Sequence, residues 1–151
     1  MSPLPADPDR RAVAIVHHML ARDAFSQWLG VELLDVRPSR VKLRMAVREE
    51  MTNGFGVCHG GVTFAFADSA LAFASNTGGK KTVSIENSMT YPAAVRVGDV
   101  LLADAEQEAS SARLAYYRIR VTRGDGAVVA LFRGTVYQTE RDHDVGADGS
   151  E

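Results

Sequence analysis

The feature that most constrains the fold is a run of mostly apolar residues from Gly61 to Asn76, which reads GVTFAFADSALAFASN. Its apolar core falls well short of the roughly 20 residues that a membrane-spanning helix needs, so no membrane association is expected. A helix formed by this run is apolar around its whole circumference and must be buried on every side. The rest of the chain therefore has to supply a surface that wraps it.

Strand patterns lie on both sides of this helix. Residues 31–36 and 41–47 are joined by the turn RPSR and predict a hairpin, which an amphipathic helix over 9–29 precedes. Residues 48–61 contain four glycines and no periodicity, and indicate an irregular loop. After the central helix come four successive predicted strands, the last of them separated by tight turns as in an antiparallel meander: 80–91, 100–109, 113–123 and 127–138. The order predicts an α+β fold, an antiparallel sheet curled around a long central helix.

Length and composition favour one domain. The 151 residues, 46% of them hydrophobic, suit a single core over 9–138, with a disordered N-terminus over 1–8 and a disordered acidic tail over 139–151. The formal net charge of -2 argues against a nucleic-acid partner. One cysteine, Cys58, allows neither an internal disulfide nor a cysteine zinc cluster, and the polar N-terminus lacks a signal-peptide pattern. We therefore expect a cytoplasmic protein without a bound metal, in which Cys58 is a buried thiol.

Asp68 stands in the middle of the apolar run. Removing an ionised carboxylate from water costs several kcal/mol unless a partner compensates it, and no Lys or Arg occurs between Arg48 and Lys80. Burial without a nearby cation raises the pKa of a carboxyl group toward the range that suits a base or nucleophile. The plainer alternative is an aspartate that points to solvent or bonds to the backbone. We interpret Asp68 as a catalytic candidate.

The sequence His59-Gly60-Gly61 lies where the loop becomes the helix. Backbone N–H groups of a first helical turn attract a negative oxygen, and glycines let a ligand approach closely. Gly61 and Asp68 are seven residues apart, about 10 Å along a helix, so they cannot act on the same atom from one helix. We expect the helix start of one chain to face Asp68 of a second, although the glycines also fit a simple helix start.

These residues resemble a known family. The segment NGFGVCHGGVTFAFADSALAFASNT (53–77) is similar to hotdog-fold thioesterases of the phenylacetic acid degradation type, whose helix region reads Asn-Gly, His-Gly-Gly, Ala-Asp and Ala-x-Asn. Weaker similarity extends over 26–138, and the motif shows no departure from the family's pattern. The alternative hotdog arrangement, with a glutamate further along the helix, is excluded because no Glu occurs between Glu50 and Glu86.

The resemblance implies roles for four residues. Asp68 activates water or attacks the thioester carbonyl itself, while the Gly61 N–H binds the developing oxyanion. Asn53 orients the water or the substrate carbonyl, and His59 hydrogen-bonds near the carbonyl or braces the loop. Asn53 with the glycine after it also fits an ordinary turn, and His59 also fits a structural histidine.

Coenzyme A contacts are implied more loosely. Gly60 and the backbone of Val83, Ser84 and Ile85 are expected to contact the substrate along its pantetheine arm. Arg113, beside a turn, is the candidate phosphate contact with Lys80 and Lys81 behind it, although charges at strand ends are commonly only solvated.

The family also implies an activity and an assembly. We expect an acyl-CoA thioesterase that needs no cofactor, acts on aromatic acyl groups such as phenylacetyl, and uses Phe64 and Phe66 in the acyl pocket unless these rings only fill the core. A curled sheet around an apolar helix leaves strand edges open until two chains join, so a homodimer is the minimum. The resemblance to the family implies a homotetramer. A hotdog 3-hydroxyacyl dehydratase or hydratase using His59 and Asp68, and a non-catalytic acyl-CoA-binding module, remain the alternatives.

Overall fold

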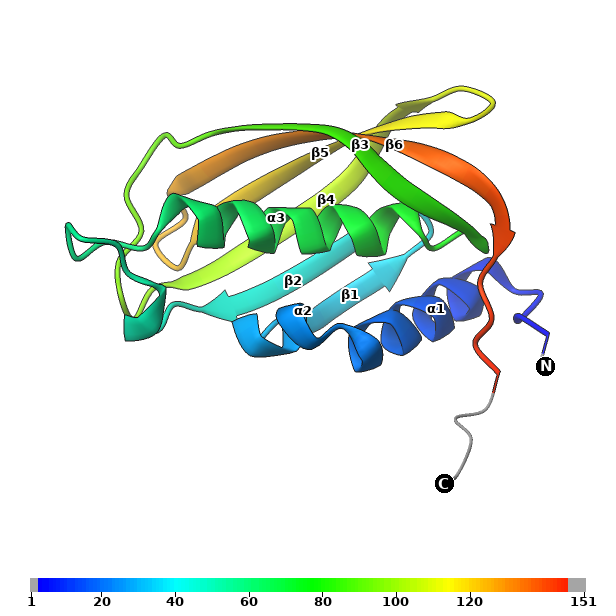
Figure 1. Cartoon of the computed structure of the whole chain (residues 1–151), viewed down its shortest axis with the longest axis horizontal. Helices are drawn as coiled ribbons and strands as arrows, with labels where there is room; N and C mark the ends of the chain where they lie inside the picture. The colour runs from blue at the N-terminus through cyan, green and yellow to red at the C-terminus, as the bar shows by residue number, and fades with distance from the viewer. Residues whose placement is uncertain (1–2, 147–151) are drawn as a thin grey trace.

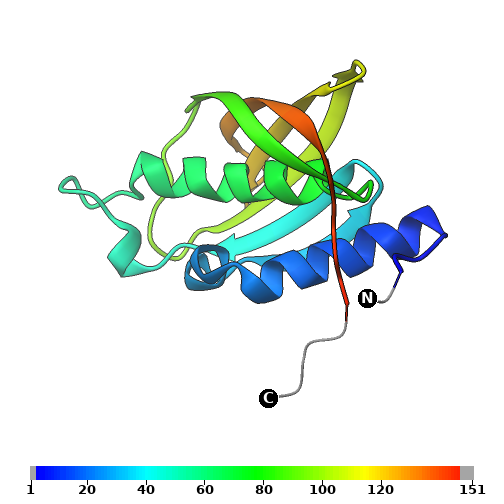
Figure 2. The ribbon, with the colours of Figure 1, turned by 45° about the vertical axis from the view of Figure 1, so that its right-hand side comes forward.

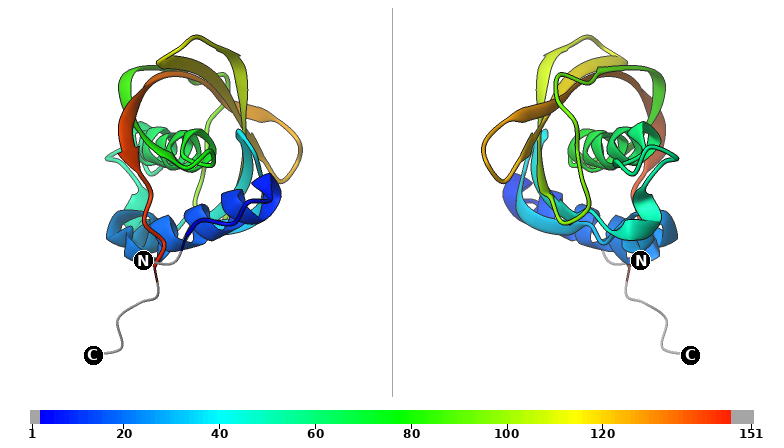
Figure 3. Two further views of the ribbon diagram at one scale, coloured as in Figure 1. Left: turned by 90° about the vertical axis from the view of Figure 1, so that its right-hand side faces the viewer. Right: turned by 90° about the vertical axis from the view of Figure 1, so that its left-hand side faces the viewer.

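In the computed structural model, which describes residues 3–146, one long helix lies inside a curved antiparallel sheet (Figure 1). End-on views show the sheet curling around this helix (Figure 3). The elements in chain order are α1 (Pro8–Arg22), α2 (Ala24–Leu29), β1 (Glu32–Arg37), β2 (Arg40–Ala46), a short 3-10 helix (Glu49–Met51), α3 (Gly60–Ser75), β3 (Lys80–Thr90), β4 (Val100–Ser110), β5 (Leu114–Arg123) and β6 (Val128–Asp142). The α+β fold expected from the sequence is confirmed. None of the helices in residues 3–146 is long and apolar enough to cross a membrane.

The order of the strands in space differs from their order in the chain. The six strands lie in the order β1-β2-β4-β5-β6-β3, all neighbours antiparallel. The predicted hairpin and a meander of β4, β5 and β6 are therefore present. β3 precedes β4 in the chain but does not lie beside it in the sheet, because it pairs with β6 at the far edge. The central helix separates β2 from β3 in the chain, and α3 crosses the sheet before β3 begins.

The central helix is buried on most of its circumference but not on all of it. Its sheet-facing side is fully covered, and the apolar side chains there, with no exposed surface, are Phe66, Ala67, Ala70, Leu71, Phe73 and Ala74. A second stripe at helical spacing is only half-buried or exposed, and it consists of Gly61, Ala65, Asp68, Ala72 and Ser75. Burial on every side is therefore not achieved within one chain.

The N-terminal helical region is broken in two. The predicted helix over 9–29 is interrupted at Asp23, whose carboxylate accepts hydrogen bonds from the Ser26 N–H at 2.9 Å and the Ser26 hydroxyl at 2.6 Å. This capping starts α2, and Gly30 ends it with a positive φ of 77°. The first helix begins at Pro8, and Arg11 donates to the Pro5 and Ala6 carbonyls, so disorder over 1–8 is wrong for these last residues.

The last strand is longer than predicted. β6 continues to Asp142, so the predicted domain end at 138 and the disorder of 139–142 are wrong. The edge of β3 offers free backbone groups, and these extend the ladder even though the added residues have no apolar face. The Thr139 hydroxyl donates to the Lys81 carbonyl at 2.7 Å, and Lys80 pairs with Asp142 at 2.7 Å. Figure 2 shows this end of β6 passing the C-terminal end of α3. Beyond β6, the His143 N–H still donates to the Gly79 carbonyl at 2.8 Å. Residues 147–151 of the predicted tail lie outside the described residues.

Candidate active site

Asp68 lies on the half-buried stripe of α3 and faces the edge strand β3. Its Oδ1 accepts a hydrogen bond from the Asn87 side-chain amide at 3.2 Å. Burial raises the pKa of Asp68, the donated hydrogen bond from Asn87 opposes this, and the negative charge of Asp23 adds to the rise. The raised pKa predicted from the sequence is confirmed, and a carboxylate of this kind can take a proton from water or attack a carbonyl carbon.

Asn87 is the site residue that the sequence analysis missed. It pairs with Gly134 of β6, whereas Ser84 pairs with the buried Val136, so both β3 side chains lie on the inner face of the sheet. An irregularity in the register between Ser84 and Glu86 makes this possible, because an extra residue turns two positions three apart to the same face. The Ser84 hydroxyl then donates to Asn87 Oδ1 at 2.8 Å. The sequence offered one signal, which is the presence of a polar Asn87 within a predicted strand. Simple alternation of inward and outward side chains does not predict that Asn87 faces the helix.

The start of α3 forms a second cluster. His59 is the N-cap residue, and its Nδ1 accepts a hydrogen bond from the Gly61 N–H at 2.9 Å. The N–H predicted to bind an oxyanion is thus already paired within the chain, so a substrate oxygen has to share or displace the His59 ring. Tyr91 donates from its hydroxyl to the Gly60 carbonyl at 2.9 Å and braces the same turn.

Asn53 stabilises the loop before this turn. Its Oδ1 accepts hydrogen bonds from the Phe55 N–H at 2.9 Å and more weakly from the Val57 N–H at 3.4 Å. This is the ordinary turn role that the sequence left open, and it engages the side-chain oxygen of Asn53. Cys58, which directly precedes His59, is buried as expected, and burial raises the pKa of its thiol.

The structure does not bring all predicted site residues together. Among the described residues, no hydrogen bond joins Asp68 to Asn53, His59 or Gly61, although Gly61 and Asp68 lie on the same stripe of α3. Two half-sites therefore exist in each chain, one at the helix start and one at mid-helix.

The predicted coenzyme A contacts are divided between the two clusters already described and a separate surface near Arg113. Val83, Ser84 and Ile85 are all exposed on the edge strand β3, Val83 and Ile85 at 51% and 57%, and the Ser84 hydroxyl donates to Asn87 on the inner face of the strand. Arg113 borders a surface depression of about 480 Å³, but its guanidinium is paired with Glu140 at 3.0 Å and donates to the Tyr137 hydroxyl at 3.3 Å.

The two candidate acyl-pocket rings differ. Phe66 has no exposed surface and belongs to the core, so we assign it no place in the acyl pocket. Phe64 is half-buried and packs edge-on against Phe132, with ring centroids 5.2 Å apart. Phe64 alone remains a candidate for the pocket.

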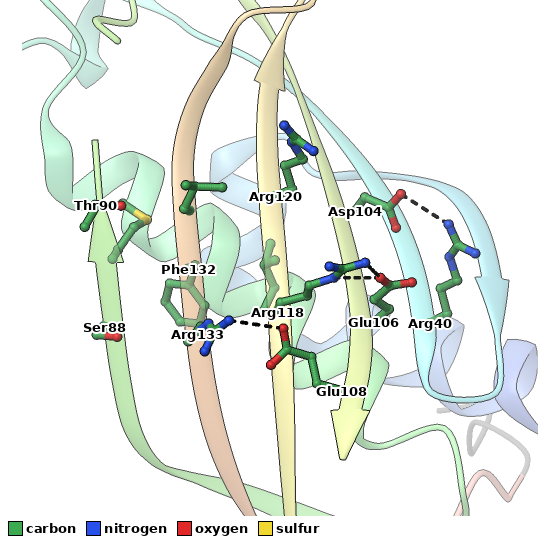
Figure 4. Close-up of a pocket in the computed structure, with 13 residues that line it drawn as sticks. Arg40, Ser88, Thr90, Asp104, Glu106, Glu108, Arg118, Arg120, Phe132 and Arg133 are labelled. Carbon is green, nitrogen blue, oxygen red and sulfur yellow. Dashed lines mark hydrogen bonds and ion pairs between the residues drawn. The ribbon is translucent and has the colours of Figure 1, made fainter. Parts of the chain in front are cut away.

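A larger hollow of about 710 Å³ on the sheet contains none of the predicted site residues (Figure 4). Three of its arginines form ion pairs within the hollow: Arg118 with Glu106, Arg40 with Asp104 at 3.3 Å, and Arg133 with Glu108 at 3.5 Å. A fourth arginine, Arg120, also lines it. Within residues 3–146, no cluster of His, Cys, Asp and Glu has the arrangement of a metal site. Asp68 and the start of α3 are the candidate sites that the described residues offer.

Comparison with known proteins identifies the family of this chain. The model of the thioesterase superfamily matches residues 55–130. A protein of Archaeoglobus fulgidus that carries the name "Putative esterase" is 35% identical over 125 residues, which cover 83% of this chain and 81% of that protein. The acyl-coenzyme A thioesterase PaaI of Escherichia coli is 31% identical over 118 residues, covering 78% of this chain and 84% of the relative.

The fold comparison gives the same result. The solved structure of the E. coli PaaI protein superposes with a TM-score of 0.88 at 28% identity, covering 90% of this chain and 99% of the other. The matched region contains the helix, the His-Gly-Gly turn and Asp68. The chain therefore belongs to the thioesterase superfamily, and within it to the hotdog-fold thioester hydrolases of the phenylacetic acid degradation type.

Proposed function

We propose that this protein hydrolyses acyl-CoA thioesters to a free acid and coenzyme A, with Asp68 as the catalytic carboxylate. The observation that carries the proposal is this half-buried carboxyl group in an apolar helix, with a pKa raised by burial and one oxygen held by Asn87. The relative from E. coli, named an acyl-coenzyme A thioesterase, supports the substrate class.

The proposed mechanism uses two chains. Asp68 of one chain takes a proton from the attacking water, the C–S bond breaks, and the proton passes to the departing coenzyme A thiolate. In the alternative route Asp68 attacks the carbonyl carbon itself, coenzyme A leaves, and water then hydrolyses the resulting mixed anhydride to regenerate Asp68. The backbone N–H groups at the start of α3 in the other chain stabilise the oxyanion, with the Gly61 N–H exchanging the His59 ring for the substrate oxygen. Asn53 and His59 hold the loop that carries these donors. Because Asp68 activates the nucleophile and backbone N–H groups bind the oxyanion, we propose that no metal or cofactor takes part, and dialysis against a chelator should leave the rate unchanged.

A homodimer is proposed because each chain leaves matching surfaces open. The edge strand β3 presents Val83 and Ile85, and the stripe of α3 around Asp68 is only half-covered. Joining two edges and two stripes removes apolar surface and unpaired backbone groups from water. Further association into a tetramer is part of the proposal and is tested by light scattering on the purified chain.

The acyl group is proposed to be aromatic, of the phenylacetyl type. The support is the similarity to a protein from a phenylacetic acid degradation operon and the half-buried ring of Phe64 four residues from Asp68 on α3. Coenzyme A is proposed to lie along Val83–Ile85, with its phosphates near Arg113 after that side chain leaves Glu140. The single buried cysteine supports a cytoplasmic location.

The test measures free thiol released from a panel of aromatic, straight-chain and 3-hydroxyacyl-CoA esters. Asp68→Asn, which keeps the shape and removes the ionisable group, should lower kcat by about 10²–10⁴-fold. Asp35→Asn is the matched control, because that carboxylate lies in β1, away from the half-buried stripe of α3. Equal thiol release by wild type and Asp68→Asn contradicts the role of Asp68. Dehydration of the 3-hydroxyacyl esters without thiol release favours the dehydratase, and binding without any turnover favours the non-catalytic module.

A further inference from the structure

The inner face of β3 carries a chain of hydrogen bonds that ends on Asp68. The register irregularity between Ser84 and Glu86 places Ser84 and Asn87 on the same face of the strand. The Ser84 hydroxyl reaches Asn87 Oδ1 at 2.8 Å, and Asn87 Nδ2 reaches Asp68 Oδ1 at 3.2 Å. All three groups are connected in one direction, from hydroxyl to amide to carboxylate.

This direction follows from the donors available. An asparagine amide can present either its oxygen or its nitrogen, and the choice depends on its neighbours. The Ser84 hydroxyl can donate to the amide oxygen, which turns the NH₂ group toward Asp68. An NH₂ group beside a carboxylate is favourable, whereas an amide oxygen there repels the ionised form. Ser84 therefore favours the amide orientation that suits an ionised Asp68.

The sheet leaves room for this amide at one position. Gly134 pairs with Asn87 across β6, and a Cβ added there would lie 2.9 Å from Asn87 Oδ1 and 2.5 Å from Leu71 Cδ2. Both distances are shorter than an ordinary van der Waals contact of about 3.5 Å. A side chain at position 134 would thus push the amide or the leucine out of place.

We infer that Asn87 is a positioning residue for Asp68: oriented by Ser84 and accommodated by Gly134, it fixes one carboxylate oxygen and leaves the other for the reacting water or thioester. The inference rests on the proposed function of Asp68. Within residues 3–146, the hydrogen bond from this neutral amide is the interaction that lowers the pKa of Asp68 against the effect of burial.

The amide has a measurable consequence for the ionisation of Asp68. Asn87→Leu keeps the approximate shape but removes the donor, so the pKa of Asp68 should rise. Asn87→Asp places a second carboxylate beside it, which should raise the pKa further. The titration midpoint of Asp68 should be lowest in wild type, higher in Asn87→Leu and highest in Asn87→Asp. Ser84→Ala should also raise the midpoint, by less than Asn87→Leu. A residue that only fills space does not produce this order.

Two measurements test the inference. The first follows the ¹³C signal of the Asp68 carboxyl carbon against pH in each full-length variant, with Asp68→Asn identifying the signal. The second follows kcat/KM for thiol release against pH, where Asn87→Leu should lower the rate roughly tenfold or more below the midpoint and recover at higher pH. Ser88→Ala is the control, because Ser88 is exposed on the opposite face of the same strand.

The two measurements separate the inference from the proposed function. Midpoints for Asp68 that coincide in wild type, Asn87→Leu and Asn87→Asp overturn the role of Asn87 whether or not the protein is active. A shifted titration with an unshifted rate profile overturns it as well, because positioning must act on the reacting group. If the wild type releases no thiol from any ester, the proposed function is contradicted. The titration still decides whether Asn87 controls the ionisation of Asp68.

Discussion

The replacement of Gly134 by alanine tests the packing between the sheet and the central helix. Gly134 lies in β6 between Asn87 of β3 and Tyr117 of β5, directly over Leu71 of α3. An added Cβ would stand 2.5 Å from Leu71 Cδ2, and Leu71 has no exposed surface into which it can turn. The helix, the leucine or the strand must therefore move.

The expected loss of stability is modest. Overpacking a well-filled core costs about 1–3 kcal/mol, and the lower chain entropy of alanine in the unfolded state returns about 0.4–1 kcal/mol. The net decrease in the free energy of unfolding should be about 1–2 kcal/mol. For a chain of this size it corresponds to a fall in Tm of roughly 2–8 °C.

The assay is urea denaturation followed by circular dichroism at one fixed protein concentration, since association contributes to apparent stability. Gly124→Ala is the matched control, because no atom lies within 4 Å of its added Cβ and its φ is not positive. Leu71→Ala alone should cost about 2–5 kcal/mol through the cavity it leaves, and the double variant should cost less than the sum of the two. Equal midpoints for Gly134→Ala and Gly124→Ala, or an additive double variant, refute the reasoning.

Three further predictions concern the periphery of the fold. Truncation after Gln138 should lower the free energy of unfolding by at least about 1–3 kcal/mol in urea, because it removes the paired end of β6. Burial lowers the pKa of His143 below 6.5, and its Nε2 lies 2.7 Å from Asn76 Oδ1. The folded chain then binds fewer protons than the unfolded chain, so stability should fall as pH drops below 6.5, and His143→Gln should reduce this slope in denaturation series at several pH values. Arg48→Met should lower the free energy of unfolding by about 1–3 kcal/mol in the same urea assay, because Arg48 donates to the Trp28 carbonyl at 2.6 Å and its guanidinium lies over the Trp28 ring.

Local patterns were sufficient to predict most of the elements. The central helix and the first five strands begin and end within one residue of their predicted bounds. Their limits are set by nearby residues: Gly78 and Gly79 close the region after α3, and Gly30 ends α2. Where a local signal was weak, the prediction failed, as at Asp23, where a single capping carboxylate divides one amphipathic stretch into two helices.

Pairing between distant strands could not be predicted in the same way. The position of β3 beside β6, and the continuation of β6 to Asp142, depend on which edge remains free after α3 has crossed the sheet. The sequence of 139–142 has no apolar alternation, and backbone pairing with β3 alone makes it a strand. Such pairing depends on backbone groups, which every residue carries, so side-chain patterns contain little information about it.

The candidate site shows the same division between local and distant causes. The absence of nearby cations and the apolar surroundings were enough to predict a raised pKa for Asp68, because both are properties of the helix itself. The partner Asn87 was not predicted, for two reasons. An amide carries no charge, and the register irregularity in β3 turns the side chain toward the helix although simple alternation of the strand would not. The pairing of the Gly61 N–H with His59 was equally hidden, since a histidine before two glycines does not reveal which way its ring turns. A carboxylate held by a neutral amide keeps its basicity, whereas a cation in the same place would lower its pKa. Because Asn87 is uncharged, the residue that the sequence concealed leaves Asp68 the raised pKa on which its proposed role as a base or nucleophile depends.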